Sequence, residues 1–221
     1  EIKRALKEVG AEEIEARTAL SILSRAKGEC IGVDEYAEGA HSPFERRVAE
    51  AWQIYERTLH KDGALDFDDL LGKAVELLRT NPPVREAYQR RWSHIHIDEY
   101  QDTNHIQAEL ANLLVGPARN ICAVGDIDQT IYSWRGAKIV NLLRFEERYP
   151  GAKMIVLEEN YRSTQNILAA ANEVITKNAE RLEKNLYTKN AEGELLSMYL
   201  AFDETDEAGF VARIIKEKIA A

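Results

Sequence analysis

The first third of the chain repeats apolar positions with the period of an α-helix. Ile2, Leu6 and Val9 share one helical face. A second face recurs at steps of three to four residues and comprises Phe44, Val48, Trp52, Tyr55 and Leu59. Residues 28–43, between the two stretches, contain several glycines and are expected to be looser. The pattern predicts a mostly helical segment, with no strand before about residue 93.

A further helix is predicted over residues 67–79. Its apolar face comprises Phe67, Leu70, Leu71, Ala74, Leu77 and Leu78. Asp66 precedes it with Asp69 three residues later, which is the spacing of a capping box. The sequence Asn81-Pro82-Pro83 is expected to end the helix, because proline has no backbone N–H and its ring clashes with the preceding turn.

After residue 93 short apolar runs alternate with helical periods. Strands are predicted at residues 94–97, 121–124, 154–157 and 195–202. Helices are predicted at residues 106–115, 138–149, 164–175 and 207–219. Strands that alternate with helices favour a parallel sheet with helical cover. The chain is therefore expected to be an α/β protein with a helical N-terminal part.

Composition excludes some classes of protein. The 221 residues are 45% hydrophobic and 30% charged, as in ordinary globular proteins. The net charge of −9 speaks against binding of nucleic acid through bulk positive charge, although a basic groove can lie on an acidic protein. Cys30 and Cys122 form no CxxC pair and are expected to be free thiols in a reducing compartment. No apolar run approaches the ~20 residues of a membrane span.

Both ends of the chain have the character of cut points. The first residue is Glu1 rather than Met, and a helical pattern is already running there. A helical pattern also runs up to Ala221 without a capping residue. We therefore expect an internal piece of a longer protein.

Two carboxylates stand where the first predicted strand ends, in the sequence Ile95-His96-Ile97-Asp98-Glu99-Tyr100-Gln101-Asp102-Thr103. Ligands of open α/β sheets bind at the carboxyl ends of strands. An aspartate there can hold Mg²⁺, and an adjacent glutamate can accept a proton from an attacking water. Asp98 and Glu99 are thus candidates for nucleotide hydrolysis. The alternative is that they only cap the following helix.

A second acidic turn follows the next predicted strand and runs from Gly125 to Gly136. Gln129 in this turn can orient a water or sense a phosphate. Aromatic rings beside a cation suit base stacking and phosphate contact, and this turn contains Tyr132, Trp134 and Arg135. The alternative is that both rings belong to the core.

A third segment reads Leu157-Glu158-Glu159-Asn160-Tyr161-Arg162-Ser163-Thr164. An arginine just before a helix can reach a phosphate across a cleft, as arginine fingers do. Alternatively, Arg162 is a surface residue beside a Ser/Thr cap.

In this order and spacing the three segments resemble the superfamily 1 DNA helicases of the UvrD, PcrA and Rep type. Asp98 to Thr103 resembles the Walker B segment of that family, Gly125 to Gly136 its motif III, and Asn160 to Ser163 its motif IV. The resemblance covers nearly the whole chain and includes Asp66 to Leu71.

The resemblance implies parts of two RecA-like motor domains of the P-loop NTPase fold. Residues 1–64 correspond to a mostly helical insertion domain (1B-like). Residues 65–156 correspond to the C-terminal part of the first RecA-like domain (1A-like), and residues 157–221 to the N-terminal part of the second (2A-like).

The resemblance also implies a role for each candidate residue. Asp98 holds Mg²⁺, Glu99 activates the water, and Gln129 contacts the γ-phosphate of ATP. Tyr161 stacks on the adenine, and Arg162 reaches the γ-phosphate from the second motor domain. Three further residues contact single-stranded DNA: Tyr132, Trp134 and Arg135.

The implied function is an ATP-dependent DNA helicase. Such an enzyme couples Mg-ATP hydrolysis to 3′ to 5′ movement along single-stranded DNA and to unwinding of duplex DNA. The implied setting is DNA repair or replication at the nucleoid, in the cytoplasm, with the remaining helicase segments in cis.

One part of the family pattern is missing. The chain contains no phosphate-binding GxxxxGK[ST] loop. Its Gly72-Lys73 pair lies in a predicted helix, with Phe67 where the first glycine should stand and Ala74 where Ser or Thr should stand. In the family this loop lies upstream of the insertion. We expect the isolated piece neither to bind nucleotide tightly nor to hydrolyse ATP.

Two other functions stay open. His94, His96 and Asp98 stand at every second position, a spacing that metal ligands can have and that would fit a metallohydrolase. The residue after Asp98 is Glu99, however, where such a motif would have histidine. The chain can also be a non-catalytic remnant of a helicase motor that binds DNA or a partner. A GxxxxGK[ST] loop upstream in the parent gene would identify a catalytic motor.

Overall fold

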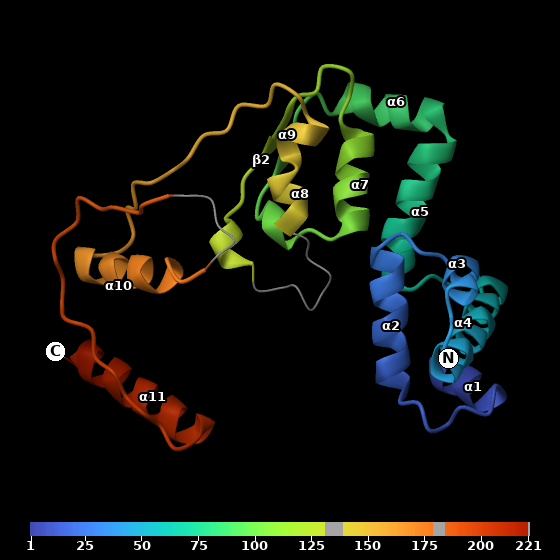
Figure 1. Cartoon of the computed structure of the whole chain (residues 1–221), viewed down its shortest axis with the longest axis horizontal. Helices are drawn as coiled ribbons and strands as arrows, with labels where there is room; N and C mark the ends of the chain where they lie inside the picture. Colours follow the sequence, from blue (N-terminus) through green and yellow to red (C-terminus); the bar gives the residue numbers. More distant parts are fainter. Residues whose placement is uncertain (131–138, 179–183, 221) are drawn as a thin grey trace. The chain divides into compact units, whose positions relative to one another are not determined.

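The computed structural model describes residues 1–130, 139–178 and 184–220. Figure 1 shows its helices and strands in chain order. The chain divides into two compact units, a first unit of residues 1–153 and a second unit of residues 154–221. None of the described helices is both long enough and apolar enough to cross a membrane.

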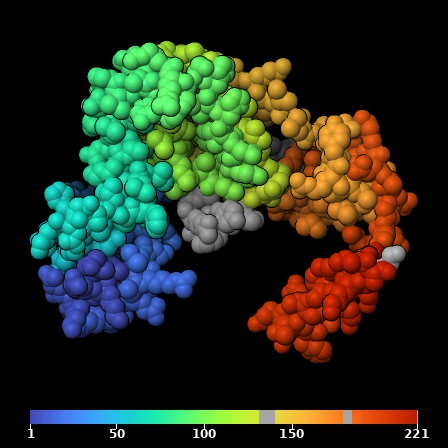
Figure 2. Space-filling view, turned by 180° about the vertical axis from the view of Figure 1, so that it is seen from behind, coloured from blue at the N-terminus to red at the C-terminus, as the bar shows by residue number. Residues whose placement is uncertain are grey.

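Four helices of the first unit surround one apolar core. They are α1 (Ile2–Glu8), α2 (Ala16–Gly28), α3 (Val33–Glu38) and α4 (Pro43–Lys61). Trp52 lies at the centre, 1% exposed, and Leu6 and Leu23 from α1 and α2 pack into the same cluster. In the space-filling view these helices form one packed mass, coloured blue to cyan (Figure 2). The predicted helical character of this segment is confirmed.

Helix α3 lies in the stretch that was expected to be looser chain, so that expectation is wrong in part. Gly32 caps the helix in extended conformation, and two acidic residues occupy the first turn. Negative charge in a first turn interacts favourably with the helix dipole. The ring of Tyr36 then packs on Trp52, with the ring centroids 5.4 Å apart. This contact with the core holds a helix that local periodicity does not reveal.

Helix α4 begins with a complete capping box. The Ser42 hydroxyl accepts a hydrogen bond from the Glu45 N–H at 3.1 Å, and the Glu45 carboxylate accepts one from the Ser42 N–H at 2.9 Å. The predicted apolar face of α4 is buried at Val48, Trp52 and Tyr55. Phe44, at the start of that face, is 45% exposed.

Two more helices follow, α5 (Phe67–Thr80) and α6 (Pro82–Arg91). The predicted capping box of α5 is confirmed, because Asp66 and Asp69 exchange backbone-to-carboxylate hydrogen bonds of 2.8 and 3.1 Å. Helix α6 was not predicted. The prolines that end α5 also begin α6, since the first helical positions need no N–H donor. Asn81 caps α6 by accepting from Val84 N at 3.2 Å.

In the described part of the first unit the sheet has two parallel strands, β1 (Ile95–Ile97) and β2 (Ile121–Ala123). Ile95 pairs with Ile121 and Ile97 with Ala123. The crossover between them carries α7 (His105–Leu114), as parallel pairing requires. Both strands and this helix match their predicted positions to within a residue. The α/β character of this part of the chain is thereby confirmed.

The helix predicted at residues 138–149 is observed as two short helices, α8 (Ile139–Leu143) and α9 (Phe145–Arg148). The break at Arg144 lets Phe145 pack edge-on against Tyr100, with the ring centroids 5.7 Å apart. Asn141 of α8 donates to the backbone carbonyl of Thr103 at 3.0 Å. Both contacts hold this helical pair against the segment that follows β1.

The second unit contains α10 (Gln165–Ile175) and α11 (Glu204–Ala220), close to two of the predicted helices. The strands predicted at residues 154–157 and 195–202 are not formed, so those predictions are wrong. Their apolar side chains are exposed, as at Leu157 (76%) and Phe202 (101%). A strand needs a hydrogen-bonded neighbour, and strand propensity alone does not supply one.

One isolated parallel bridge joins Glu159 to Tyr187 in the second unit. Asn160 N donates to Tyr187 O at 2.7 Å, and Tyr187 N donates to Glu158 O at 3.0 Å. This bridge anchors the segment before α10 to the segment after it. No residue of α11 is buried, and Figure 2 shows that helix, in red, protruding from the rest of its unit.

Candidate functional site

The carboxyl ends of β1 and β2 bring two acidic segments together. Beyond the last paired residues of the two strands, Val124 N donates to Ile97 O at 2.8 Å, and Tyr100 N donates to Val124 O at 2.9 Å. The chain leaving β1 is therefore bonded to the chain leaving β2. Asp98 and Glu99 follow β1 directly, and the turn with Asp126 follows β2.

Glu99 has left-handed backbone geometry, with φ 51° and ψ 45°. This conformation costs a non-glycine residue about 1 kcal/mol, so the surrounding contacts must hold it. The Asp98 carboxylate accepts a hydrogen bond from Glu99 N at 3.0 Å, which stabilises the turn. Both Asp98 and Glu99 have exposed side chains. The site thus presents two adjacent carboxylates to solvent at the end of a strand.

Gln101 links the two acidic segments through its side-chain amide. Its Nε2 donates to Glu99 Oε2 at 2.7 Å, and its Oε1 accepts from Asp126 N at 3.0 Å. The side chain is 1% exposed. Gln101 is not among the residues predicted from sequence to act in the site. Its partner Asp126 lies 25 positions away, so no local pattern in the sequence marks it.

The Asp126 carboxylate organises the turn that follows β2. Its Oδ1 accepts from Asp128 N at 2.9 Å, and its Oδ2 accepts from the side chain of Gln129 at 2.9 Å. Glu99, Gln101, Asp126 and Gln129 are therefore joined by consecutive hydrogen bonds. Three of the predicted site residues, Asp98, Glu99 and Gln129, lie in this one arrangement.

The predicted DNA-contacting residues lie outside the described part of the chain. Tyr132, Trp134 and Arg135 fall within residues 131–138. Their roles stay predictions.

The second unit holds the remaining candidates in a turn before α10. The Asn160 side chain accepts from Arg162 N at 2.9 Å and from Ser163 N at 2.7 Å. Asn190 donates to Tyr161 O at 3.3 Å and to Ser163 O at 3.1 Å. Tyr161 is 79% exposed, and the Arg162 side chain is also exposed. The turn therefore fixes the backbone while leaving both side chains accessible, and their roles stay predictions.

Neighbouring side chains shift the pKa values of Glu159 and Tyr161 in this turn. A hydrogen bond to the Glu159 carboxylate, together with its negative charge, raises the pKa of Tyr161. The ammonium of Lys189, 2.7 Å from Glu159, lowers the pKa of that carboxyl. Tyr161 therefore keeps its phenol proton to a higher pH than an isolated tyrosine.

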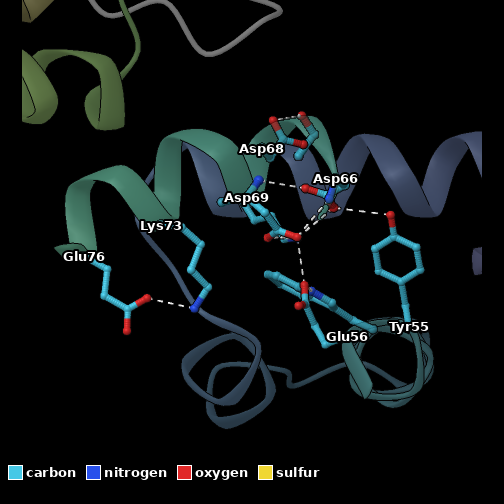
Figure 3. A network of polar contacts seen from close by, with 10 residues as sticks. Tyr55, Glu56, Asp66, Asp68, Asp69, Lys73 and Glu76 are labelled. Atoms are coloured by element: carbon cyan, nitrogen blue, oxygen red, sulfur yellow. Dashed lines mark hydrogen bonds and ion pairs between the residues drawn. The ribbon is translucent and has the colours of Figure 1, made fainter. Parts of the chain in front are cut away.

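A second polar cluster joins α2, α4 and α5. The carboxylates of Glu56, Asp66 and Asp69 point toward one another (Figure 3), and their oxygens lie within 4.8 Å of one another. The Lys27 ammonium lies 2.7, 2.8 and 2.7 Å from them. Burial acts to lower the pKa of Lys27, but these hydrogen bonds outweigh it and raise that pKa. The cluster is thus filled by a cation of the chain itself.

The histidines proposed as metal ligands form no such cluster. The His94 and His96 rings are stacked with their centroids 6.4 Å apart, and both side chains are exposed. Within the described ranges, the one group of three or more acidic, histidine or cysteine residues close enough to share an ion is Glu56, Asp66 and Asp69. The geometry lends the metallohydrolase interpretation no support.

Comparison with known families matches both units to helicase domains. Residues 1–150 match the family described as the UvrD/REP helicase N-terminal domain. Residues 155–220 match the family described as the UvrD-like helicase C-terminal domain.

Comparison with curated proteins finds relatives that share the name ATP-dependent DNA helicase PcrA. The one from Leuconostoc citreum is 41% identical over 218 residues, which is 98% of this chain and 29% of the relative. The one from Bacillus subtilis is 45% identical over 71% of this chain and 21% of its own length. The one from Staphylococcus aureus is 45% identical over 97% of this chain and 30% of its own length. The chain thus spans less than a third of each of these relatives.

Proposed function

Because the chain belongs to the UvrD/REP helicase family, we propose that it is part of an ATP-dependent DNA helicase. In this proposal the complete protein couples Mg-ATP hydrolysis to movement along single-stranded DNA and to unwinding of duplex DNA. The relatives that carry the name ATP-dependent DNA helicase PcrA support it.

The observation that carries the proposal is the hydrogen-bonded chain from Glu99 through Gln101 and Asp126 to Gln129. It lies at the carboxyl ends of two parallel strands, where α/β folds bind ligands. The proposed base, Glu99, and the amide proposed to sense phosphate, that of Gln129, are thus linked by hydrogen bonds. Such a connection is what coupling of hydrolysis to movement requires.

The residues after β1 fit Mg²⁺ and a hydrolytic water. Asp98 offers an exposed carboxylate, the hard oxygen ligand that Mg²⁺ prefers. The bound ion would neutralise phosphate charge. Glu99, next to it, accepts the proton of the attacking water. Gln129 contacts the γ-phosphate in this proposal.

Two residues of the second unit are also assigned to ATP in this proposal, on the resemblance to the family. Tyr161 stacks on the adenine, and Arg162 contacts the γ-phosphate. The Asn160 turn supports both roles, because it holds the backbone of Arg162 and Ser163 by hydrogen bonds while the side chains stay exposed.

The finer parts of the proposal rest on the family. We assign residues 1–64 to the insertion domain that contacts duplex DNA, 65–156 to the first motor domain and 157–221 to the second. Single-stranded DNA is contacted by Tyr132, Trp134 and Arg135. Movement is 3′ to 5′, in DNA repair or replication at the nucleoid.

The isolated chain is not expected to turn over ATP. Its 221 residues contain no GxxxxGK[ST] loop, whose lysine and backbone amides cradle the phosphates of P-loop enzymes. Catalysis is therefore assigned to the complete protein.

ATP hydrolysis by the complete protein, with and without single-stranded DNA, tests the proposal, with this chain assayed beside it. We expect strong stimulation of the complete protein by DNA and no hydrolysis by the isolated chain. A complete protein that binds DNA but hydrolyses no ATP would instead identify a non-catalytic remnant.

A further inference from the structure

Gln101 spans the space between the hydrolytic carboxylate and the phosphate-sensing turn. We propose that it is a positioning residue, which aligns Glu99 and couples it to the turn of Asp126 and Gln129. This inference rests on the function proposed above. It adds a residue that connects the proposed base, Glu99, to the turn that contains Gln129. Among the described residues, Gln101 is the one buried polar side chain.

The partners of Gln101 permit only one orientation of its amide. Nε2 donates to the Glu99 carboxylate, and Oε1 accepts from the Asp126 backbone N–H. Rotating the amide by half a turn would place Gln101 Oε1 beside the Glu99 carboxylate. It would also place the Gln101 NH₂ group beside the Asp126 N–H. Both contacts would then be repulsive inside a buried site, where an unpaired polar group is costly. The amide is therefore a fixed connector rather than a filler of space.

Gly125 leaves room for this connector. A Cβ atom at Gly125 would lie 2.8 Å from Gln101 Oε1, 3.4 Å from Gln101 N and 3.3 Å from a methyl carbon of Leu142. The side-chain amide would have to move, and it would give up its two hydrogen bonds. The glycine before Asp126 is therefore required by the close approach of Gln101.

Through Gln101, a movement of the turn that contains Asp126 and Gln129 can shift the Glu99 carboxylate. A displacement of Asp126 or Gln129 when phosphate binds moves the Asp126 N–H. That N–H is bonded to Gln101 Oε1 at 3.0 Å, and the other end of the amide is bonded to Glu99 at 2.7 Å. A shift in the turn thus changes the direction of the Glu99 carboxylate. A residue that only filled the core would not produce such a link.

Gln101→Leu in the complete protein tests the proposal, because leucine keeps the apolar bulk and removes both hydrogen bonds. We expect the kcat for ATP to fall about tenfold or more while KM stays unchanged. The stimulation by single-stranded DNA should fall as well, and less so in a Gln129→Ala background. Gln89→Leu is the matched control. That residue also makes two hydrogen bonds, to Leu113 O and Val115 O, away from the carboxyl ends of the strands.

Gly125→Ala is the second variant, since it displaces the same amide without changing Gln101. It should reproduce the loss of kcat even if Gln101→Leu fails to fold. Wild-type kcat and DNA stimulation in a folded Gln101→Leu or Gly125→Ala protein would overturn the proposal, provided that Glu99→Gln is inactive. A complete wild-type protein without ATPase activity would overturn the proposed function and this inference together.

Discussion

The Lys27 ammonium shows how one side chain can hold several elements together. It lies within 2.8 Å of carboxylates from α4, from the capping position of α5 and from the first turn of α5. Its side chain is only 11% exposed, so solvent screens these ion pairs little. Removing the cation would leave three carboxylates close together in a poorly solvated place.

Lys27→Met should therefore destabilise the first unit. We expect a loss of about 3 kcal/mol in the free energy of unfolding, because a partly buried ion cluster loses its cation. Urea denaturation followed by circular dichroism measures it. Lys73→Met is the control, since the ion pair of Lys73 with Glu76 is exposed on both sides and should contribute less than about 0.5 kcal/mol. Equal losses in the two variants would contradict a special role for Lys27.

The stability that the same cluster contributes should depend on pH in one direction. Burial acts to raise the pKa of Asp66, but hydrogen bonds from Lys27 and from Asp69 N outweigh it and hold that pKa below its ordinary value of 3.8. A lowered carboxyl pKa stabilises the fold above the ordinary value and ceases to do so as the pH falls through the folded-state value. The stability difference between wild type and Lys27→Met should therefore shrink below pH 3.8. A difference that stays constant down to pH 2 would contradict this assignment.

Glu99→Gln in the complete protein tests the assignment of the base. Glutamine keeps the size of the side chain but cannot accept the proton of water. We expect ATP turnover to fall by about 10²- to 10⁴-fold while nucleotide binding persists, measured by steady-state hydrolysis and by equilibrium titration. Glu86→Gln, at an exposed ion pair on α6, is the control and should be fully active. Full activity of Glu99→Gln would assign the base to another group.

Local sequence points to some residues of this arrangement and not to others. Asp98, Glu99 and Gln129 are candidates because each stands in an acidic turn directly after a predicted strand, and their roles stay predictions. Gln101 and Lys27 were missed because their partners are distant in sequence. Gln101 Oε1 accepts a hydrogen bond from a residue 25 positions away, and the hydrogen bonds that Lys27 donates reach residues 39 and 42 positions away. No local pattern marks such pairs.

At the scale of elements, local pattern predicted most of the helices, whereas two of the four predicted strands are formed. The helices α5, α7 and α10 carry periodic apolar faces and, in α5, a capping box, all of which are local properties. The strands β1 and β2 were predicted from short apolar runs, and they form because they pair with each other. Residues 154–157 and 195–202 have the composition of strands, but neither segment is in a ladder. Strand formation depends on a neighbour that the local sequence does not specify.

The capping box at the start of α7 should stabilise the crossover between the strands. Asn104 accepts from Gln107 N at 3.0 Å, and Asn104 N donates to the Gln107 side chain at 3.1 Å. Asn104→Ala should lower the free energy of unfolding of the first unit by about 1 kcal/mol. Glu15→Ala is the control, because Glu15 caps α2 without a side-chain hydrogen bond. Denaturant titration of both variants measures the difference, and equal small losses would contradict the prediction.

At the scale of the whole molecule the two units differ in how much apolar surface they bury. The first unit contains a continuous core of buried side chains around Trp52. In the described part of the second unit, Leu168 is the one buried hydrophobic side chain. Cooperative unfolding requires a core, so the units should differ in their cooperativity.

Thermal unfolding of the chain should therefore show one cooperative transition, from the first unit. The second unit should lose its helical signal gradually, because few packed contacts hold it together. Near-ultraviolet circular dichroism of the tryptophans, whose three positions all fall within residues 1–153, reports on the first unit. Site-labelled hydrogen exchange in α10 and α11 reports on the second. A second sharp transition in α10 would contradict the prediction.

The unpaired segments at residues 154–157 and 195–202 have a practical consequence. Proteases bind their substrates as extended chains, and a segment that belongs to no ladder can present its backbone to a protease. Apolar side chains such as Leu157, Leu200 and Phe202 are exposed along these segments and suit the specificity pockets of chymotrypsin-like enzymes. Limited digestion will therefore cut the chain there first, and the first unit will be the fragment that survives.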